Sequence, residues 1–195
     1  MTATQFVLAS RSPRRVQLLR EQGYVFDCLP VDLPEVPAPG EAPLAYARRL
    51  ALDKARAAHA RSGRPALGAD TDVSLDGRIL GKPRDAEDAC AMLLALSGRS
   101  HQVISAVALV DGAREEVVAT RTEVEFVSLD RAQALAYWAS GEPADKAGAY
   151  AIQGLGGRYV RALRGSYSGV VGLPLAETAE LLAQFGIHPG PVAAV

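Results

Sequence analysis

Short apolar runs alternate with amphipathic segments along most of the chain. Residues 6–9 form an uninterrupted apolar run, which predicts a buried strand. Ser12 and Pro13 then have the pattern of a helix N-cap followed by proline at the first helical position, and Gly23 is the expected stop. Residues 24–29 alternate like a second strand. The first part of the chain therefore predicts the order strand, helix, strand.

The rest of the chain continues this interleaving. Further helices are expected at residues 44–62, 85–97, 130–140 and 174–186. Further strands are expected at residues 66–69, 102–110, 116–127 and 159–163, with a hairpin at residues 72–80 around Asp76-Gly77. Interleaved strands and helices predict the α/β class, and the hairpins predict a mixed sheet rather than an all-parallel one.

Composition and charge narrow the possible partners. The chain is 49% hydrophobic and 22% charged, as in ordinary globular proteins, and its net charge of -1 gives no reason to expect nucleic acid or a membrane surface as a partner. No apolar run reaches the roughly 18 residues of a transmembrane helix, and no signal peptide is expected. Cys28 and Cys90 form no CxxC pattern and are expected to be reduced, and buried or inert. We therefore expect a cytoplasmic protein with a single domain over residues 1–195.

Residues 10–15, Ser-Arg-Ser-Pro-Arg-Arg, follow the first predicted strand and open the first helix. A helix amino terminus presents free N–H groups and a partial positive charge, which suit a phosphate. Ser10, Arg14 and Arg15 would add charge-assisted hydrogen bonds there. The segment indicates a phosphate site, and the alternative is a capped helix with solvated arginines.

Two acids lie at the end of the strand predicted at residues 66–69. Asp70 and Asp72 flank Thr71 at a strand end, the place where ligands gather in α/β folds, and their carboxylates suit Mg²⁺. The alternative is a polar turn. Lys82 is able to reach a phosphate as a point charge or else is solvated.

Residues 141–157 are glycine-rich and polar, which predicts a loop. Glu142, Asp145 and Lys146 are expected to face water there. Gln153 follows an apolar run, so its amide needs a partner if it is buried. That partner is either backbone or the edge of a ligand's base.

Six segments occur in an order that resembles the Maf family of nucleotide pyrophosphatases. Each is short, but the ordered set is specific and extends from about residue 7 to residue 185. The segments are residues 10–15 (SRSPRR), 68–71 (GADT), 81–83 (GKP), 97–101 (SGRSH), 142–154 (EPADKAGAYAIQG) and 165–174 (GSYSGVVGLP).

The resemblance implies a Maf/ITPase-like fold: a mixed, twisted sheet flanked by helices, in two lobes with a cleft between them. It also implies hydrolysis of a nucleoside triphosphate between its α- and β-phosphates with a divalent metal cation, Mg²⁺ or Mn²⁺, and a homodimer. Matches at Arg14, Thr71 and Gln153 indicate the pyrimidine branch, which acts on dTTP, UTP and modified pyrimidine nucleotides. The implied site consists of the catalytic residues Asp70 and Lys82, the metal ligands Asp70 and Glu35, and the substrate-binding residues Ser10, Arg14, Arg15, Lys54, Thr71 and Gln153.

The chain departs from the family pattern at three positions. Asp72 replaces a short aliphatic or polar residue, Gly169 stands where Asn is frequent, and Ser105 stands where Thr is commoner. Two other functions stay open at this point. One is the same chemistry on another base, such as 7-methyl-GTP, and the other is a nucleotide-binding regulator of cell division or septum formation.

Overall fold

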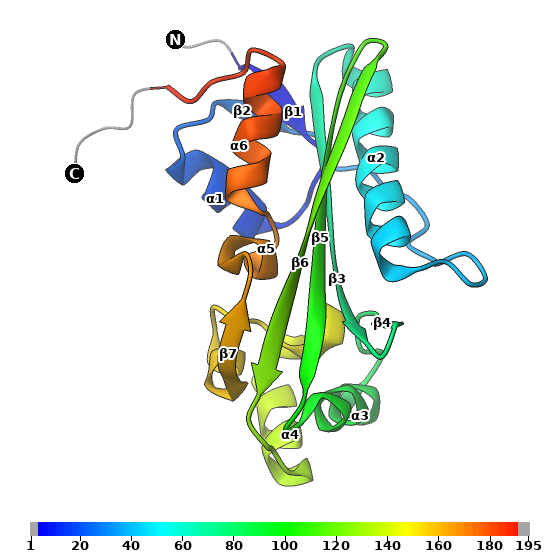
Figure 1. Ribbon diagram of the computed structural model, residues 1–195, viewed down its shortest axis with the longest axis vertical. Coiled ribbons are helices and arrows are strands. Elements are labelled where there is room, and N and C mark those ends of the chain that lie inside the picture. The colour runs from blue at the N-terminus through cyan, green and yellow to red at the C-terminus, as the bar shows by residue number, and fades with distance from the viewer. Residues whose placement is uncertain (1–3, 191–195) are drawn as a thin grey trace.

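The computed structural model describes residues 4–190, and its centre is a seven-stranded sheet in the order β2-β1-β3-β5-β6-β7, with β4 paired to β3 (Figure 1). The strands β2, β1 and β3 are parallel, and all other pairings are antiparallel. The sheet is therefore mixed, as predicted. Its strands are β1 (Phe6–Leu8), β2 (Phe26–Cys28), β3 (Ala66–Leu75), β4 (Arg78–Leu80), β5 (Ser100–Asp111), β6 (Arg114–Phe126) and β7 (Val160–Arg164).

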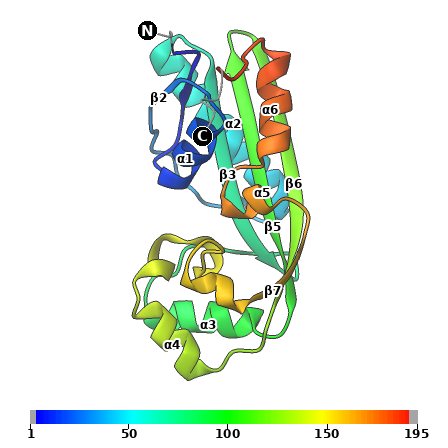
Figure 2. The same cartoon turned by 90° about the vertical axis from the view of Figure 1, so that its left-hand side faces the viewer.

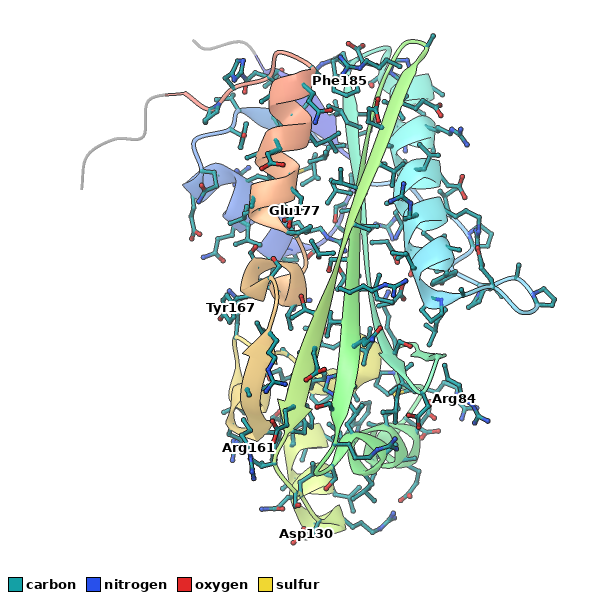
Figure 3. The ribbon with its side chains drawn as sticks, viewed as in Figure 1. Arg84, Asp130, Arg161, Tyr167, Glu177 and Phe185 are labelled. Carbon is teal, nitrogen blue, oxygen red and sulfur yellow. The ribbon has the colours of Figure 1, made fainter. Side chains whose placement is uncertain are left out.

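The helices divide the molecule into two lobes that share the long strands β3, β5 and β6 (Figure 2). The first lobe holds β1, β2, α1 (Pro13–Glu21), α2 (Pro43–Ser62) and α6 (Leu175–Gln184). The second lobe holds β7, α3 (Ala86–Leu96), α4 (Arg131–Trp138) and the short helices η1 (Glu142–Asp145), η2 (Ala147–Ala149) and η3 (Leu155–Tyr159). In Figure 3, Phe185 beyond α6 and Asp130 before α4 mark opposite ends of the molecule.

Side-chain alternation along β5 explains how the sheet is covered in the first lobe. Ala106 and Ala108 pack towards α2, whereas Val107 and Leu109 belong to the core beneath α1 and α6. Successive residues of a strand point to opposite faces, so a run that is apolar throughout is buried on both. The second lobe has its own core, which includes Leu93.

The structure corrects three expectations. The predicted strand ends at Ala69, but β3 runs unbroken to Leu75, because β5 pairs with each residue from Ala66 to Ser74. The short helix α5 (Tyr167–Val171) was not predicted. Cys28 is exposed rather than buried, since β2 lies at the edge of the sheet; Cys90 is buried as expected. Among the described residues, no helix is long and apolar enough to cross a membrane.

Close packing of α2 on β3 depends on Gly68. A Cβ atom at this position would overlap the carbonyl oxygen of Ala51 and lie 2.6 Å from the amide nitrogen of Ala55. Both are backbone atoms of α2, so neither can move without moving the helix. The absence of a side chain at Gly68 therefore allows α2, which carries Lys54, to pack close to β3.

We expect Gly68→Ala to lower the free energy of unfolding by about 1–3 kcal/mol, because overpacking forces the backbone apart. Urea denaturation would measure the change. Gly81→Ala is the matched control, since a Cβ there meets no atom within 4 Å and the backbone is not left-handed. Equal midpoints for the two variants would contradict the argument.

Candidate active site

A cavity of about 810 Å³ lies between the two lobes. Residues of the β1–α1 turn, α2 and β3 line it from the first lobe, and residues 79–82 and 145–152 contribute from the other side. Every candidate site residue of the sequence analysis except Gln153 lines this one cavity. The structure thus brings together side chains that are widely separated in the sequence.

Arg15 joins three segments at one end of the cavity. Its Nε donates to the carbonyl oxygen of Gly172 (2.8 Å), its Nη1 to Oγ of Ser10 (3.3 Å) and its Nη2 to Oγ1 of Thr71 (3.2 Å). All three nitrogen atoms are therefore engaged by the protein. In this arrangement Arg15 fixes α1 against β3 and against the turn between α5 and α6.

Arg14 is held at one atom only. Its Nε donates to the carbonyl oxygen of Val171 (3.2 Å), and its Nη atoms have no hydrogen-bond partner within residues 4–190. The guanidinium group lines the cavity beside the amino terminus of α1. Arg14 is therefore better placed than Arg15 to offer hydrogen bonds to an anion.

An alternating row of cations and carboxylates crosses the cavity. Nζ of Lys54, on α2, lies 2.7 Å from Oδ1 of Asp70 and 2.7 Å from Oε1 of Glu35. Nζ of Lys82 lies 3.3 Å from the other carboxylate oxygen of Glu35. Burial acts to raise the pKa of Glu35, but hydrogen bonding to Lys54 and the charges of both lysines outweigh it and lower that pKa. Glu35 is thus ionised and ties the two lysines together.

Asp72 adds a second buried carboxyl group next to Asp70. Both residues are 7% exposed, and Oδ2 of Asp72 is buried without a hydrogen-bond partner among the described residues. Burial, and then the negative charge of Asp70, raise the pKa of Asp72 to about 9. The two carboxyl groups therefore repel one another when both are ionised.

The glycine-rich segment is more ordered than the sequence indicated. Lys146 forms an ion pair with Asp145, and both residues line the cavity. The carboxylate of Glu142 accepts hydrogen bonds from Oη of Tyr137 and from the amide nitrogen of Leu155, so it organises the second lobe. The expectation that these residues face water is therefore wrong for Lys146, which is 13% exposed at its side chain, and for Glu142, whereas Asp145 is 75% exposed and faces water as expected.

Gln153 lies beside the cavity, not in its wall. Its side chain is exposed and lines a small neighbouring pocket, which shares Arg14 and Ile152 with the cavity. The amide makes no hydrogen bond with another of the described residues. No protein group therefore fixes which way it points.

The carboxylates of the cavity offer a divalent cation only part of a ligand set. No three His, Cys, Asp or Glu side chains within residues 4–190 are grouped so that they hold a metal by themselves. The ammonium group of Lys54 occupies the position between Glu35 and Asp70. However, Mg²⁺ is commonly held by one or two carboxylates and completed by substrate phosphates. The unpartnered oxygen of Asp72 beside Asp70 fits such a shared site.

Comparison with known proteins gives one consistent family. The model of the family described as Maf-like protein matches residues 5–185. A protein of Xanthomonas campestris named dTTP/UTP pyrophosphatase is 52% identical over 93% of this chain and 98% of its own length. A protein of Saccharophagus degradans with the same name is 51% identical over 92% of this chain and 88% of its own. Among solved structures, a nucleoside-triphosphatase (dITP/XTP pyrophosphatase) from Mycobacterium abscessus is 19% identical with a TM-score of 0.47, over 92% of this chain and 96% of that one.

Proposed function

Because this chain belongs to the Maf family, we propose that it is a nucleoside triphosphate pyrophosphatase that converts dTTP and UTP, and modified pyrimidine nucleotides, to the monophosphate and pyrophosphate. One observation carries the proposal: a single cavity holds the cations Arg14, Lys54 and Lys82 together with the buried carboxylate of Asp70. Binding of a polyphosphate requires positive charge to offset its own negative charge, and hydrolysis requires a group that positions the attacking water.

Binding of the triphosphate is the task of the basic side chains. Its negative charge must be offset before an oxygen atom can approach phosphorus. Arg14 and the amino terminus of α1 offer donors to the cavity, and Lys82, which is 60% exposed at its side chain, offers a cation that lines the same cavity. Ser10 and Thr71 hold Arg15 in the wall of this cavity. The α-phosphate would then lie near Asp70.

Asp70 is proposed to orient the attacking water. Lys54 holds its carboxylate at 2.7 Å, so one oxygen is fixed and the other remains for water or a cation. Because Lys54 and burial hold this carboxylate in one place, we assign it the alignment of the attacking water. Water attacks the α-phosphorus, the bond to the bridging oxygen breaks, and pyrophosphate leaves.

A divalent cation, Mg²⁺ or Mn²⁺, is part of the proposal, with Asp70 as a ligand. When bound, such a cation neutralises phosphate charge and polarises the phosphorus. Glu35 faces the same cavity but pairs with Lys54 and Lys82, so its role as a metal ligand stays a prediction. The homodimer, the cytoplasmic location and the single domain over residues 1–195 also stay predictions.

The test is a panel of natural and modified nucleoside triphosphates with Mg²⁺ or Mn²⁺, scored for pyrophosphate against orthophosphate. We expect pyrophosphate from dTTP and UTP, and no product after the metal is chelated. Orthophosphate would place the cleavage at another bond, and a preference for 7-methyl-GTP would support the alternative base. Binding without turnover across the whole panel would favour the regulator instead.

Gln153→Ala is expected to reduce discrimination among bases more than it reduces hydrolysis. Uracil and thymine offer an acceptor at O4 and a donor at N3, which an amide matches with one hydrogen bond each. Cytosine offers the reverse order, which a flipped amide matches equally well, so Gln153 discriminates between the two bases only when its orientation is fixed in the bound complex. A hydrogen bond is worth about 0.5–1.5 kcal/mol net, and for an amide held in one orientation we expect the preference for UTP over CTP to fall roughly 2- to 10-fold in the variant. The control is Gln102→Ala, because Gln102 is an exposed glutamine on β5 that does not line the cavity. An unchanged ratio of kcat/KM values would count against a base contact.

A further inference from the structure

We propose that Asp72, together with Asp70, forms the carboxylate pair that holds the divalent cation in this protein. The inference rests on the proposed function for the presence of a cation, and it changes the expected ligand set, in which Glu35 was the partner of Asp70. Three features of the site support it: the position of Asp72 on β3, its unpartnered oxygen, and the contacts that occupy Glu35.

The position follows from strand geometry. Asp70 and Asp72 are two residues apart on β3, so their side chains project from the same face of the sheet. That face is the one covered by α2, because Asp70 bonds to Lys54 of this helix. Both side chains line the cavity, and both are more than nine-tenths buried. A cation that reaches Asp70 from the cavity therefore meets Asp72 as well.

One carboxyl oxygen of Asp72 has no hydrogen-bond or ion-pair partner among the described residues. This oxygen, Oδ2, is buried. Burying a polar oxygen without a partner costs roughly 1–3 kcal/mol, and more when the group is charged. Lys54, the nearest cation, is already shared between Asp70 and Glu35. A divalent cation bound from the cavity would supply that partner.

Glu35 is less suited to be the second ligand. Both of its carboxylate oxygens are engaged, one by Lys54 and one by Lys82. Its side chain is also 41% exposed, against 9% for Asp70. Coordination by Glu35 would require breaking two ion pairs, whereas coordination by Asp72 breaks none. The remaining ligands would be water and phosphate oxygens, as is usual for Mg²⁺.

The experiment measures binding of Mn²⁺ alone to the full chain, from the electron paramagnetic resonance signal of the free ion at neutral pH. The variants are Asp72→Asn, which keeps the shape and replaces one carboxyl oxygen by an amide nitrogen, and Glu116→Gln, which makes the same replacement at an exposed residue of β6 outside the cavity. Loss of a group that only supports a ligand weakens metal binding by about 10- to 100-fold, so loss of a ligand is expected to weaken it at least tenfold. Glu116→Gln is expected to bind like the unaltered protein.

Equal Mn²⁺ affinity for Asp72→Asn and the unaltered protein would overturn the inference, as would failure of the unaltered protein to bind Mn²⁺. The result is independent of the proposed function, which is judged by pyrophosphate release in the nucleotide panel. Circular dichroism verifies that each variant is folded. If Asp72→Asn does not fold, Asp72→Thr, with a side chain favoured in strands, provides the same comparison.

Discussion

Asp70→Asn is expected to lower kcat for dTTP by about 10²- to 10⁴-fold, the range typical for loss of a group that assists proton transfer or positions water. Asparagine has the same shape as aspartate, but it carries no negative charge to attract a cation, and only one of its two terminal atoms accepts a hydrogen bond from water. Lys54 keeps its ion pair with Glu35, so the site retains its other contacts. The protein should therefore stay folded while turnover is lost.

The measurement is pyrophosphate release under saturating dTTP and metal, with thermal unfolding as the check on folding. Asp76→Asn is a matched control: Asp76 is exposed, pairs with Arg99 and lies in the turn between β3 and β4, where asparagine tolerates the left-handed backbone. Its kcat should not change. Near-normal turnover of Asp70→Asn would remove Asp70 from the mechanism.

Features that depend on local sequence were predictable. Helix α2 ends at Gly63, whose φ of 65° is the left-handed conformation that glycine adopts readily. Asp130 caps α4 through a reciprocal pair of hydrogen bonds with Gln133. The turn after β3 has positive φ at both Asp76 and Gly77, as expected for the Asp-Gly pair. Each of these features involves residues no more than four positions apart.

Features set by tertiary contacts were missed. Counting apolar runs alone ends the strand before Asp70, Thr71 and Asp72, yet β5 stays paired with β3 through these three residues. The helix α5 is only five residues long, and it is held by Ser166, whose side chain accepts from the amide of Gly169. Nothing in hydrophobic periodicity marks so short an element.

The site itself was partly visible from the sequence. The family resemblance indicated which residues belong to the site, but it did not indicate which of them form ion pairs. Lys82 and Glu35, for example, are in contact although they are 47 positions apart in the chain. One sign for Lys54 was available. The buried side of α2 includes Leu50, Ala51, Ala55 and Ala58, and Lys54 falls on that side. A lysine on the buried side of a helix needs a partner, which here is Asp70.

Lys54→Met is expected to destabilise the fold as well as the reaction. Methionine fills a similar volume, but it leaves Asp70 buried beside Asp72 without a cation. Breaking a buried ion pair by removing one partner typically costs about 3–5 kcal/mol, and Lys54 and Asp70 are both less than one-tenth exposed. The contact with half-exposed Glu35 adds little to this figure, because water screens it.

The matched control is Lys82→Met, since Lys82 pairs with the same Glu35 but its side chain is 60% exposed. An exposed pair contributes about 0–1 kcal/mol, so this variant should unfold at nearly the same urea concentration as the unaltered protein. Both variants should lose turnover, because both remove a cation from the cavity. Only Lys54→Met should lose several kcal/mol of stability, and equal urea midpoints for the two would mean that the ammonium group of Lys54 does not support the buried carboxylates. Comparison of the two variants therefore distinguishes two roles. Both lysines contribute to binding of the phosphates, whereas only the buried Lys54 stabilises the folded site.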